Sequence, residues 1–308
     1  MVTYEDFKAK VVKMVETYYS RNCQNVEVGL TRVRKVNGLS LDGIVITLNE
    51  EGNNVAPTIY LKGYFRDYIN GRAIEDIVQS IIDVNERNKI HHIDVKQFID
   101  FDRVKDSIKC KIVNTAWNKE LLEDIPHVEF LDMSIVFIAG FEQFPDGYVT
   151  VNNQHLKLWG IDKDELFEIA KRNSLKEQYF IKDMLSIITD FREECELASL
   201  LDGEDLEENV TDTFMYVMSN REKLFGANVI LQEKYLERMS RVFRGNFYIL
   251  PSSIHELITL PAFDESQEHI KELKKMVTEV NKSQVSIEER LSDNVYFYNA
   301  TTKKITIA

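Results

Sequence analysis

The sequence predicts an α+β fold in which helices pack on antiparallel sheets. Three observations support this prediction. Residues 214–261 place short apolar runs on both sides of an amphipathic segment. Asn37-Gly38 stands between two alternating runs, which is typical of a β-hairpin. Apolar residues at helical spacing recur near the start, in the middle and near the end of the chain.

Residues 214–261 predict the order strand, strand, helix, strand, strand. Apolar runs at 214–218 and 227–231 precede a helical pattern that stops at Gly245, and runs at 247–250 and 257–260 follow it. The short links favour antiparallel hairpins over a parallel βαβ unit. Together with an amphipathic helix at 268–280, they predict a C-terminal ββαββα unit. A terminal β-hairpin follows, made from 295–298 and 304–307.

The first half of the chain predicts further helices and strands. A helix is expected over 4–19, where Thr3 and Asp6 have capping-box spacing with Asp in place of the usual Glu or Gln. An extended piece at 57–61 precedes helices at 64–69 and after Gly71.

Two strands are expected in the middle of the chain. In 108–112, Cys110 alternates with Lys109 and Lys111, so a half-buried strand is predicted with its cysteine in the core and its lysines in water. The run 128–138 is apolar on both faces and predicts one central strand.

The chain is long enough for two to three subdomains. The predicted division is an N-terminal α+β region at 1–125, a middle αβ region at 126–192, a linker at 193–210 and a C-terminal α+β domain at 211–308. The linker is inferred from its composition, because 193–209 hold eight acidic residues and no basic one.

Composition limits the partners and the compartment. A net charge of −13 argues against nucleic acid and against an anionic membrane surface as partners. The longest apolar run, 135–141, is far shorter than the roughly 20 residues of a membrane helix. Three widely spaced cysteines without a CxxC pair fit reduced thiols, so a cytoplasmic protein is predicted.

No familiar catalytic, metal or nucleotide motif is present. There are no glycines at GxG spacing, no GxxxxGK[ST] and no GxSxG. His255-Glu256 begins like HExxH, but Thr259 stands where the second histidine is required. We therefore predict no metal and no cofactor. Ser253 and Glu256 instead have the spacing of a capping box on a single helical turn.

Several polar residues at strand ends and turns remain as site candidates. The catalytic candidates are His127, Asp132, His255 and Glu256. The binding candidates are Asn220, Arg221, Ser252 and Ser253. Asp132 is the most informative of them, because a carboxylate inside an apolar strand needs a partner, for which His127 or Arg221 could serve.

Six segments together resemble an uncharacterised bacterial family from gut Clostridia: PTIYLKGYF, EDIPHVEFLDMSIVF, LKLWGIDKDELFEIA, NREKLFGANVIL, FYILPSSIHELITLP and LSDNVYFYN. The resemblance runs nearly end to end and is most specific between Asn220 and Pro261. The WGIDKDEL segment and the last strands are also similar, more weakly, to an uncharacterised family from Bacilli. The resemblance implies a bacterial source and a cytoplasmic setting, and it brings no catalytic residues.

Two functions are compatible with these observations. The leading hypothesis is a cytoplasmic, non-enzymatic binding or regulatory protein that acts through contacts with a protein partner, since aromatic strands such as 296–298 could pack against one. The alternative is an enzyme of unrecognised type, a hydrolase that uses the His, Asp and Glu candidates for acid–base chemistry. The basic run 32–35 is the sole pointer to nucleic acid, which the overall charge disfavours.

Overall fold

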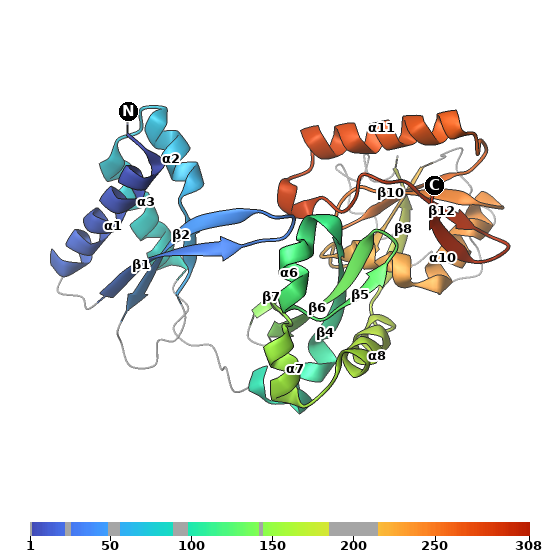
Figure 1. Cartoon of the computed structure of the whole chain (residues 1–308), viewed down its shortest axis with the longest axis horizontal. Helices are drawn as coiled ribbons and strands as arrows, with labels where there is room; N and C mark the ends of the chain where they lie inside the picture. Colours follow the sequence, from blue (N-terminus) through green and yellow to red (C-terminus); the bar gives the residue numbers. More distant parts are fainter. Residues whose placement is uncertain (1, 22–25, 49–55, 89–97, 142–143, 185–214) are drawn as a thin grey trace. The chain divides into compact units, whose positions relative to one another are not determined.

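The computed structural model describes residues 2–21, 26–48, 56–88, 98–141, 144–184 and 215–308 (Figure 1). The contacts divide the chain into two compact units, Met1–Phe98 and Ile99–Ala308. The first unit has one described antiparallel sheet and the second has two, all with packed helices, so the predicted α+β class is confirmed. The predicted linker at 193–210 lies outside the described residues.

The N-terminal unit is a three-stranded antiparallel sheet of order β1-β2-β3 with helices packed against it. Its elements are α1 (Tyr4–Arg21), β1 (Val26–Arg34), β2 (Ser40–Leu48), β3 (Thr58–Tyr60), α2 (Lys62–Ile69) and α3 (Ile74–Arg87). Residues of α1 and α3 such as Phe7, Val11 and Ile77 are fully buried against Ile44 of β2. This single-sided packing gives the unit one core.

Local signals in the N-terminal unit are confirmed by the structure. The Thr3 hydroxyl accepts the Asp6 N–H at 3.1 Å, and the Asp6 carboxylate accepts the Thr3 N–H at 3.1 Å, so Asp completes the capping box. In the β1–β2 turn, Asn37 (φ 60°) and Gly38 (φ 67°) are both left-handed, as a two-residue hairpin turn requires.

The C-terminal unit contains two antiparallel sheets. The first joins β6 to β4 on one side and to β5 and β7 on the other. Its elements are α5 (Phe101–Val104), η1 (Lys105–Ser107), β4 (Ile108–Asn114), η2 (Ala116–Asn118), α6 (Lys119–Asp124), β5 (His127–Phe130), β6 (Met133–Phe141), β7 (Phe144–Thr150), α7 (Asn153–Trp159) and α8 (Lys163–Ser174).

The second sheet has six strands in the order β13-β12-β10-β11-β9-β8. Its elements are β8 (Tyr179–Asp183), β9 (Tyr216–Asn220), η5 (Gly226–Leu231), α10 (Glu233–Phe243), β10 (Phe247–Pro251), β11 (Leu257–Pro261), α11 (Gln267–Ser283), η6 (Ile287–Glu289), β12 (Tyr296–Asn299) and β13 (Lys304–Ile307). The predicted terminal hairpin is confirmed by β12 and β13. Strand β8 pairs with β9 although the acidic segment separates them in sequence.

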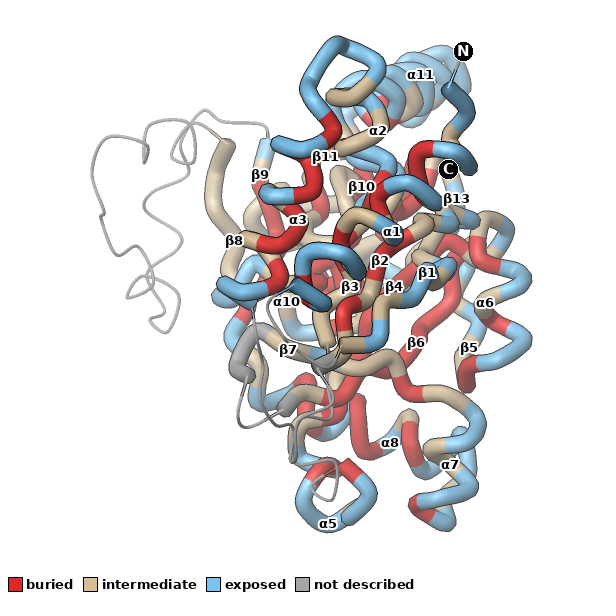
Figure 2. The backbone as a smooth tube through the Cα atoms, turned by 90° about the vertical axis from the view of Figure 1, so that its left-hand side faces the viewer, coloured by how far each residue is buried: buried red, intermediate tan, exposed pale blue. Residues whose placement is uncertain are grey.

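Helices cover both faces of the six-stranded sheet. Phe247 and Ile249 of β10 pack in one core with α10 and η5, whereas Tyr248 and Leu250 pack in another with α11. Successive side chains of a strand point to opposite faces, so β10 is buried throughout its length. Residues 133–139 of β6 and the whole of β10 are buried, and β6 is drawn as a largely red tube in Figure 2.

Two predicted strands are wrong. The run 128–138 is not one strand but the hairpin β5–β6, which turns at Leu131 (φ 58°) and Asp132. The run 227–231 is the 3-10 helix η5 rather than a strand. In both places a left-handed residue, Leu131 or Phe225 (φ 57°), redirects the backbone where apolar composition alone suggests extended structure.

Strand β4 is buried on both faces, which corrects the half-buried prediction. Cys110 lies in the core as expected, at 2% exposure. Lys111, however, does not face water but is 6% exposed, with its ammonium 4.2 Å from the centre of the Phe225 ring. Because α8 and η5 both pack on β4, the aliphatic part of the Lys111 side chain covers apolar surface and its ammonium lies over the Phe225 ring.

Asp132 ties the β5–β6 turn to the segment before β12. Its carboxylate accepts hydrogen bonds from the Ser292 hydroxyl (2.7 Å), the Asn294 amide (2.9 Å) and the Tyr296 hydroxyl (2.8 Å). Burial, reinforced by the charge of Asp132, raises the pKa of Tyr296, so this hydroxyl stays a donor. Asp132 therefore finds its partners neither in His127 nor in Arg221.

Replacing Asp132 by Ala should destabilise the C-terminal unit by roughly 2–3 kcal/mol, because it leaves three donors without their charged acceptor. Chemical denaturation of D132A and of D106A provides the measurement and its control. Asp106 is 77% exposed at the side chain and should change the free energy of unfolding by less than about 0.5 kcal/mol. Equal effects of the two substitutions would contradict a structural role for Asp132.

Candidate functional site

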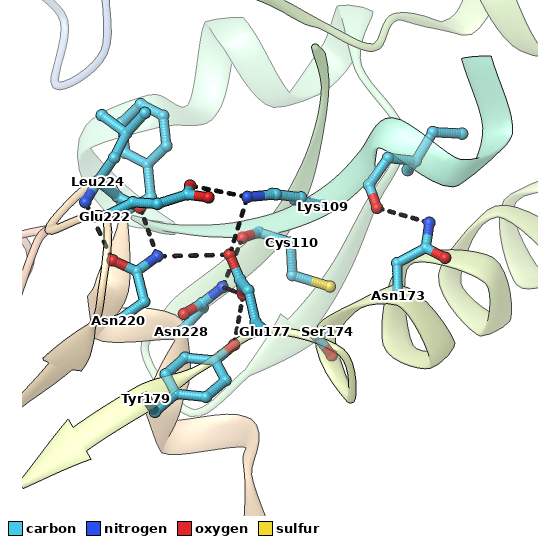
Figure 3. Close-up of polar contacts among 12 residues, drawn as sticks. Lys109, Cys110, Asn173, Ser174, Glu177, Tyr179, Asn220, Glu222, Leu224 and Asn228 are labelled. Atoms are coloured by element: carbon cyan, nitrogen blue, oxygen red, sulfur yellow. Dashed lines mark hydrogen bonds and ion pairs between the residues drawn. The ribbon is translucent and has the colours of Figure 1, made fainter. Parts of the chain in front are cut away.

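A cluster of polar side chains joins the two sheets of the C-terminal unit around the Glu177 carboxylate (Figure 3). Glu177 lies between α8 and β8, and its side chain is 9% exposed. Its carboxylate accepts the Tyr179 hydroxyl at 2.6 Å and the Asn228 amide at 3.2 Å. On the other oxygen, Lys109 of β4 lies at 3.2 Å and the Asn220 amide at 3.4 Å.

Four donors satisfy the acceptor capacity of this carboxylate, so a buried charge is compensated on every side. The donors come from β4, β8, β9 and η5, and the carboxylate therefore fixes these four elements relative to one another. Burial and the neighbouring Glu177 charge raise the pKa of Tyr179, which keeps its hydroxyl a donor.

Lys109 and Cys110 have defined protonation states beside this carboxylate. Burial lowers the pKa of Lys109, but the carboxylates of Glu222 and Glu177 outweigh burial and raise it, so the ammonium stays charged. Burial, with Glu177 adding to it, raises the pKa of Cys110 to about 12. The thiol is therefore protonated near neutral pH and is a poor nucleophile.

The Glu177 cluster supports a loop at Arg221–Gly226, called here the 221–226 loop. Asn220 is 1% exposed, and its side chain accepts the Leu224 N–H at 3.0 Å and donates to the Leu224 carbonyl at 2.8 Å. Glu222 pairs with Lys109 at 2.8 Å. The Arg221 N–H donates to the Gln178 carbonyl at 2.8 Å, which ties the loop to the α8–β8 connection.

His255 holds the 221–226 loop from the opposite side. Its Nδ1 accepts the Phe225 N–H at 3.1 Å, and its ring stacks on Phe225 with centroids 5.5 Å apart. Its own carbonyl accepts the Ser219 hydroxyl at 2.7 Å. Burial, with Lys111 contributing and Glu289 opposing, lowers the pKa of His255, which keeps Nδ1 able to accept a hydrogen bond.

The backbone of the 221–226 loop is strained. Lys223 (φ 52°) and Phe225 (φ 57°) are both left-handed, which costs a non-glycine residue on the order of 1 kcal/mol or more. Residues in this region persist when the surrounding structure determines them, as Asn220 and His255 do here. The loop exposes the charged side chains of Arg221, Glu222 and Lys223 on this rigid support.

Six of the eight sequence-predicted candidates lie in or beside the 221–226 loop, whereas Asp132 and His127 bond to other segments. Asn220 and His255 support the 221–226 loop, and Arg221 is its first residue. Asp132 lies with the segment before β12, while Nδ1 of His127, at the start of β5, contacts the Ile125 carbonyl at 3.1 Å.

Ser252, Ser253 and Glu256 belong to the β10–β11 hairpin loop, because Pro251 and Leu257 are paired across it. The predicted capping box is wrong, since there is no helical turn here. Ser253 instead accepts the His255 N–H at 3.0 Å, and Ser252 donates to Glu256 at 3.4 Å.

Sequence reasoning missed Glu177, Tyr179 and Asn228. A signal existed for Asn228, since an amide inside the apolar run 226–231 must find a hydrogen-bond partner. In the structure its Nδ2 donates to the Cys110 carbonyl at 3.1 Å as well as to Glu177. Glu177 carried no such signal, because it follows a helix in a polar stretch.

Residues 4–300 match the family of unknown function DUF5688. The chain belongs to this family. The resemblance to an uncharacterised family over nearly the whole chain is thereby confirmed. No curated protein and no solved structure matches the chain.

Within the described ranges of this DUF5688 protein, no three His, Cys, Asp or Glu side chains are grouped so that they could hold a metal ion. Across the same ranges, no helix is both long and apolar enough to span a bilayer.

Gly226 should not tolerate a side chain. A Cβ there would lie 2.5 Å from the Asn220 nitrogen and 2.7 Å from the His255 carbonyl oxygen, both of them backbone atoms. G226A should therefore lower the free energy of unfolding by roughly 1–3 kcal/mol or more. G245A is the control, since nothing lies within 4 Å of its Cβ position, and comparable unfolding of the two variants would refute this packing argument.

His255 should make stability depend on pH. Its folded-state pKa is lowered, so as pH falls below about 6.5 the unfolded chain binds a proton that the folded chain resists. Stability should therefore fall over the window from about 6.5 down to the folded-state pKa. In H255N, the side-chain oxygen can accept the Phe225 N–H without titrating, and this part of the pH dependence should disappear.

The measurement is the difference in unfolding free energy between wild type and H255N from pH 7.5 to 5. The pKa of His155 is also lowered by burial, but His155 is present in both proteins, so the difference isolates His255. Parallel pH profiles would show that His255 does not accept the Phe225 N–H as a neutral ring.

Proposed function

We propose that this protein is a non-enzymatic binding or regulatory protein that recognises a protein partner through the 221–226 loop. One observation carries the proposal: the loop contains two left-handed non-glycine residues, Lys223 and Phe225, and is held by side-chain bonds from Asn220 to Leu224 and from His255 to Phe225. A loop fixed in advance loses little conformational entropy when it binds. Binding residues are commonly placed on such loops by a rigid scaffold.

The chemistry of the loop suggests a partner surface of mixed charge. Arg221, Glu222 and Lys223 are exposed side by side. Tyr148, at 41% exposure, contacts the same loop, with its ring edge-on to that of Phe225 and the two ring centroids 4.8 Å apart. Arginine and tyrosine are enriched at protein interfaces, which supports protein contact over a small-molecule ligand.

The hydrolase alternative rests on His127, Asp132, His255 and Glu256 and requires several of them to share a pocket. Asp132 is bonded to residues 292–296, whereas His255 is bonded to the 221–226 loop. Each of these two side chains is bonded to structural partners of its own, which favours the binding proposal. We further propose the bacterial, cytoplasmic setting that the sequence resemblance implies.

Arg221 and Lys223 can be tested by co-purification from a lysate of the source organism. We expect the wild type to retain a defined protein, identified by mass spectrometry, and the variant R221Q/K223N to recover it at least tenfold less. Asparagine is chosen at residue 223 because it tolerates the left-handed conformation. Loss of the two charges should leave the melting temperature unchanged within a few degrees.

The matched control is K274Q/K275Q, which removes two exposed positive charges from α11. It should retain the partner at the wild-type level. Equal recovery by the loop variant, or the repeated absence of any defined partner, would reject the proposal.

A further inference from the structure

Among the residues that the structure describes, strand β1 of the N-terminal unit is an edge strand nine residues long. The sheet order is β1-β2-β3, and the β1–β2 register runs without interruption from Val26–Leu48 to Arg34–Ser40. An edge of this length presents a row of backbone donors and acceptors to an additional strand.

The alternating hydrogen bonds between β1 and β2 show which backbone groups of β1 point away from the sheet. The Lys35 N–H donates to the Leu39 carbonyl at 2.7 Å, in the same register as the β1–β2 pairs. Odd-numbered residues of β1 therefore point their backbone groups at β2, and even-numbered ones point away. The same alternation holds in β2. The Asp42 carbonyl accepts the Leu61 N–H at 3.0 Å, so the backbone groups of this even-numbered residue point away from β1.

The apolar core of this unit is open at the same edge. Leu30, Ile44 and Ile59 form one row across β1, β2 and β3 on the face that packs against the helices. Ile44 is 0% and Ile59 6% exposed, but Leu30 is 48% exposed. One more strand beside β1 would continue the row and cover Leu30.

We propose that the occupant of this edge is a second copy of the chain, paired antiparallel through β1 about a two-fold axis at Leu30. Leu30 is the middle residue of the nine, so this register alone uses the whole strand. It would place the exposed Leu30 of each copy against the other and create a continuous six-stranded sheet.

The charges of β1 suit this self-pairing. The register sets Glu27 opposite Val33, Arg32 opposite Val28 and Arg34 opposite Val26 of the other copy. No like charges face each other, and the arginine stems can cover the valines while their guanidinium groups reach water. Arg32 already pairs with Asp42 at 2.8 Å, so its charge is compensated in either state.

This self-association is independent of the 221–226 loop, which belongs to the other unit. A single pair of strands makes a small interface, so the dimer should depend on protein concentration. Sedimentation analysis of the full chain should show a dimer fraction that rises with concentration. L30K should weaken dimerisation at least tenfold, because two ammonium groups would meet at the axis.

I69K is the matched control, since Ile69 is a 66% exposed apolar residue of α2 in the same unit. It should dimerise like the wild type. A wild type that stays monomeric at all concentrations, or a dimer that L30K leaves unchanged, would overturn the proposal.

Hydrogen exchange in the wild type tests the same edge without a substitution. The outward amides of Val28, Leu30 and Arg32 should exchange more slowly as the protein concentration rises. Exchange at these three amides that does not change with concentration, in a protein that does dimerise, would place the dimer interface elsewhere and reject pairing through β1.

Discussion

The C-terminal unit depends on one buried carboxylate. Glu177 carries a negative charge into a region where two sheets meet, and a charge there is tolerated because four donors surround it. Each donor comes from a different structural element, so satisfying the charge also sets the spacing of those elements. Apolar packing alone constrains such positions less sharply, since hydrophobic contact has no preferred direction.

Asn220 connects the buried Glu177 carboxylate to the 221–226 loop at the surface. Its amide bonds both to the buried carboxylate and to the Leu224 carbonyl, so the interior and the 221–226 loop are connected by a single side chain. His255 completes the support by accepting the Phe225 N–H. The strained conformation of the 221–226 loop is therefore maintained by buried hydrogen bonds. Changes to these bonds should alter the surface proposed for recognition.

The sequence predicted structure best where the signal was local. The Asn37-Gly38 turn and the Thr3–Asp6 capping box depend on neighbouring residues, and both were confirmed. The strand predicted at 227–231 failed because Phe225 and Gly226 are fixed by Asn220 and His255, and the latter is 30 residues distant. Asp132 was correctly singled out as needing partners, but those partners lie 160 residues further along the chain. No local pattern carries that pairing.

The long reach of Asp132 has a consequence for the order in which the protein folds. Its bonds span 160–164 residues, and the Asn114 amide bonds to the Leu291 carbonyl 177 residues away. During synthesis, the Asp132 carboxylate and the Asn114 amide of the first sheet cannot form these hydrogen bonds until residues 291–296 have been made. The N-terminal unit closes its core within its first 98 residues and has no such delay. Folding rates fall as contacts become more distant in sequence, so the N-terminal unit should fold faster than the C-terminal unit.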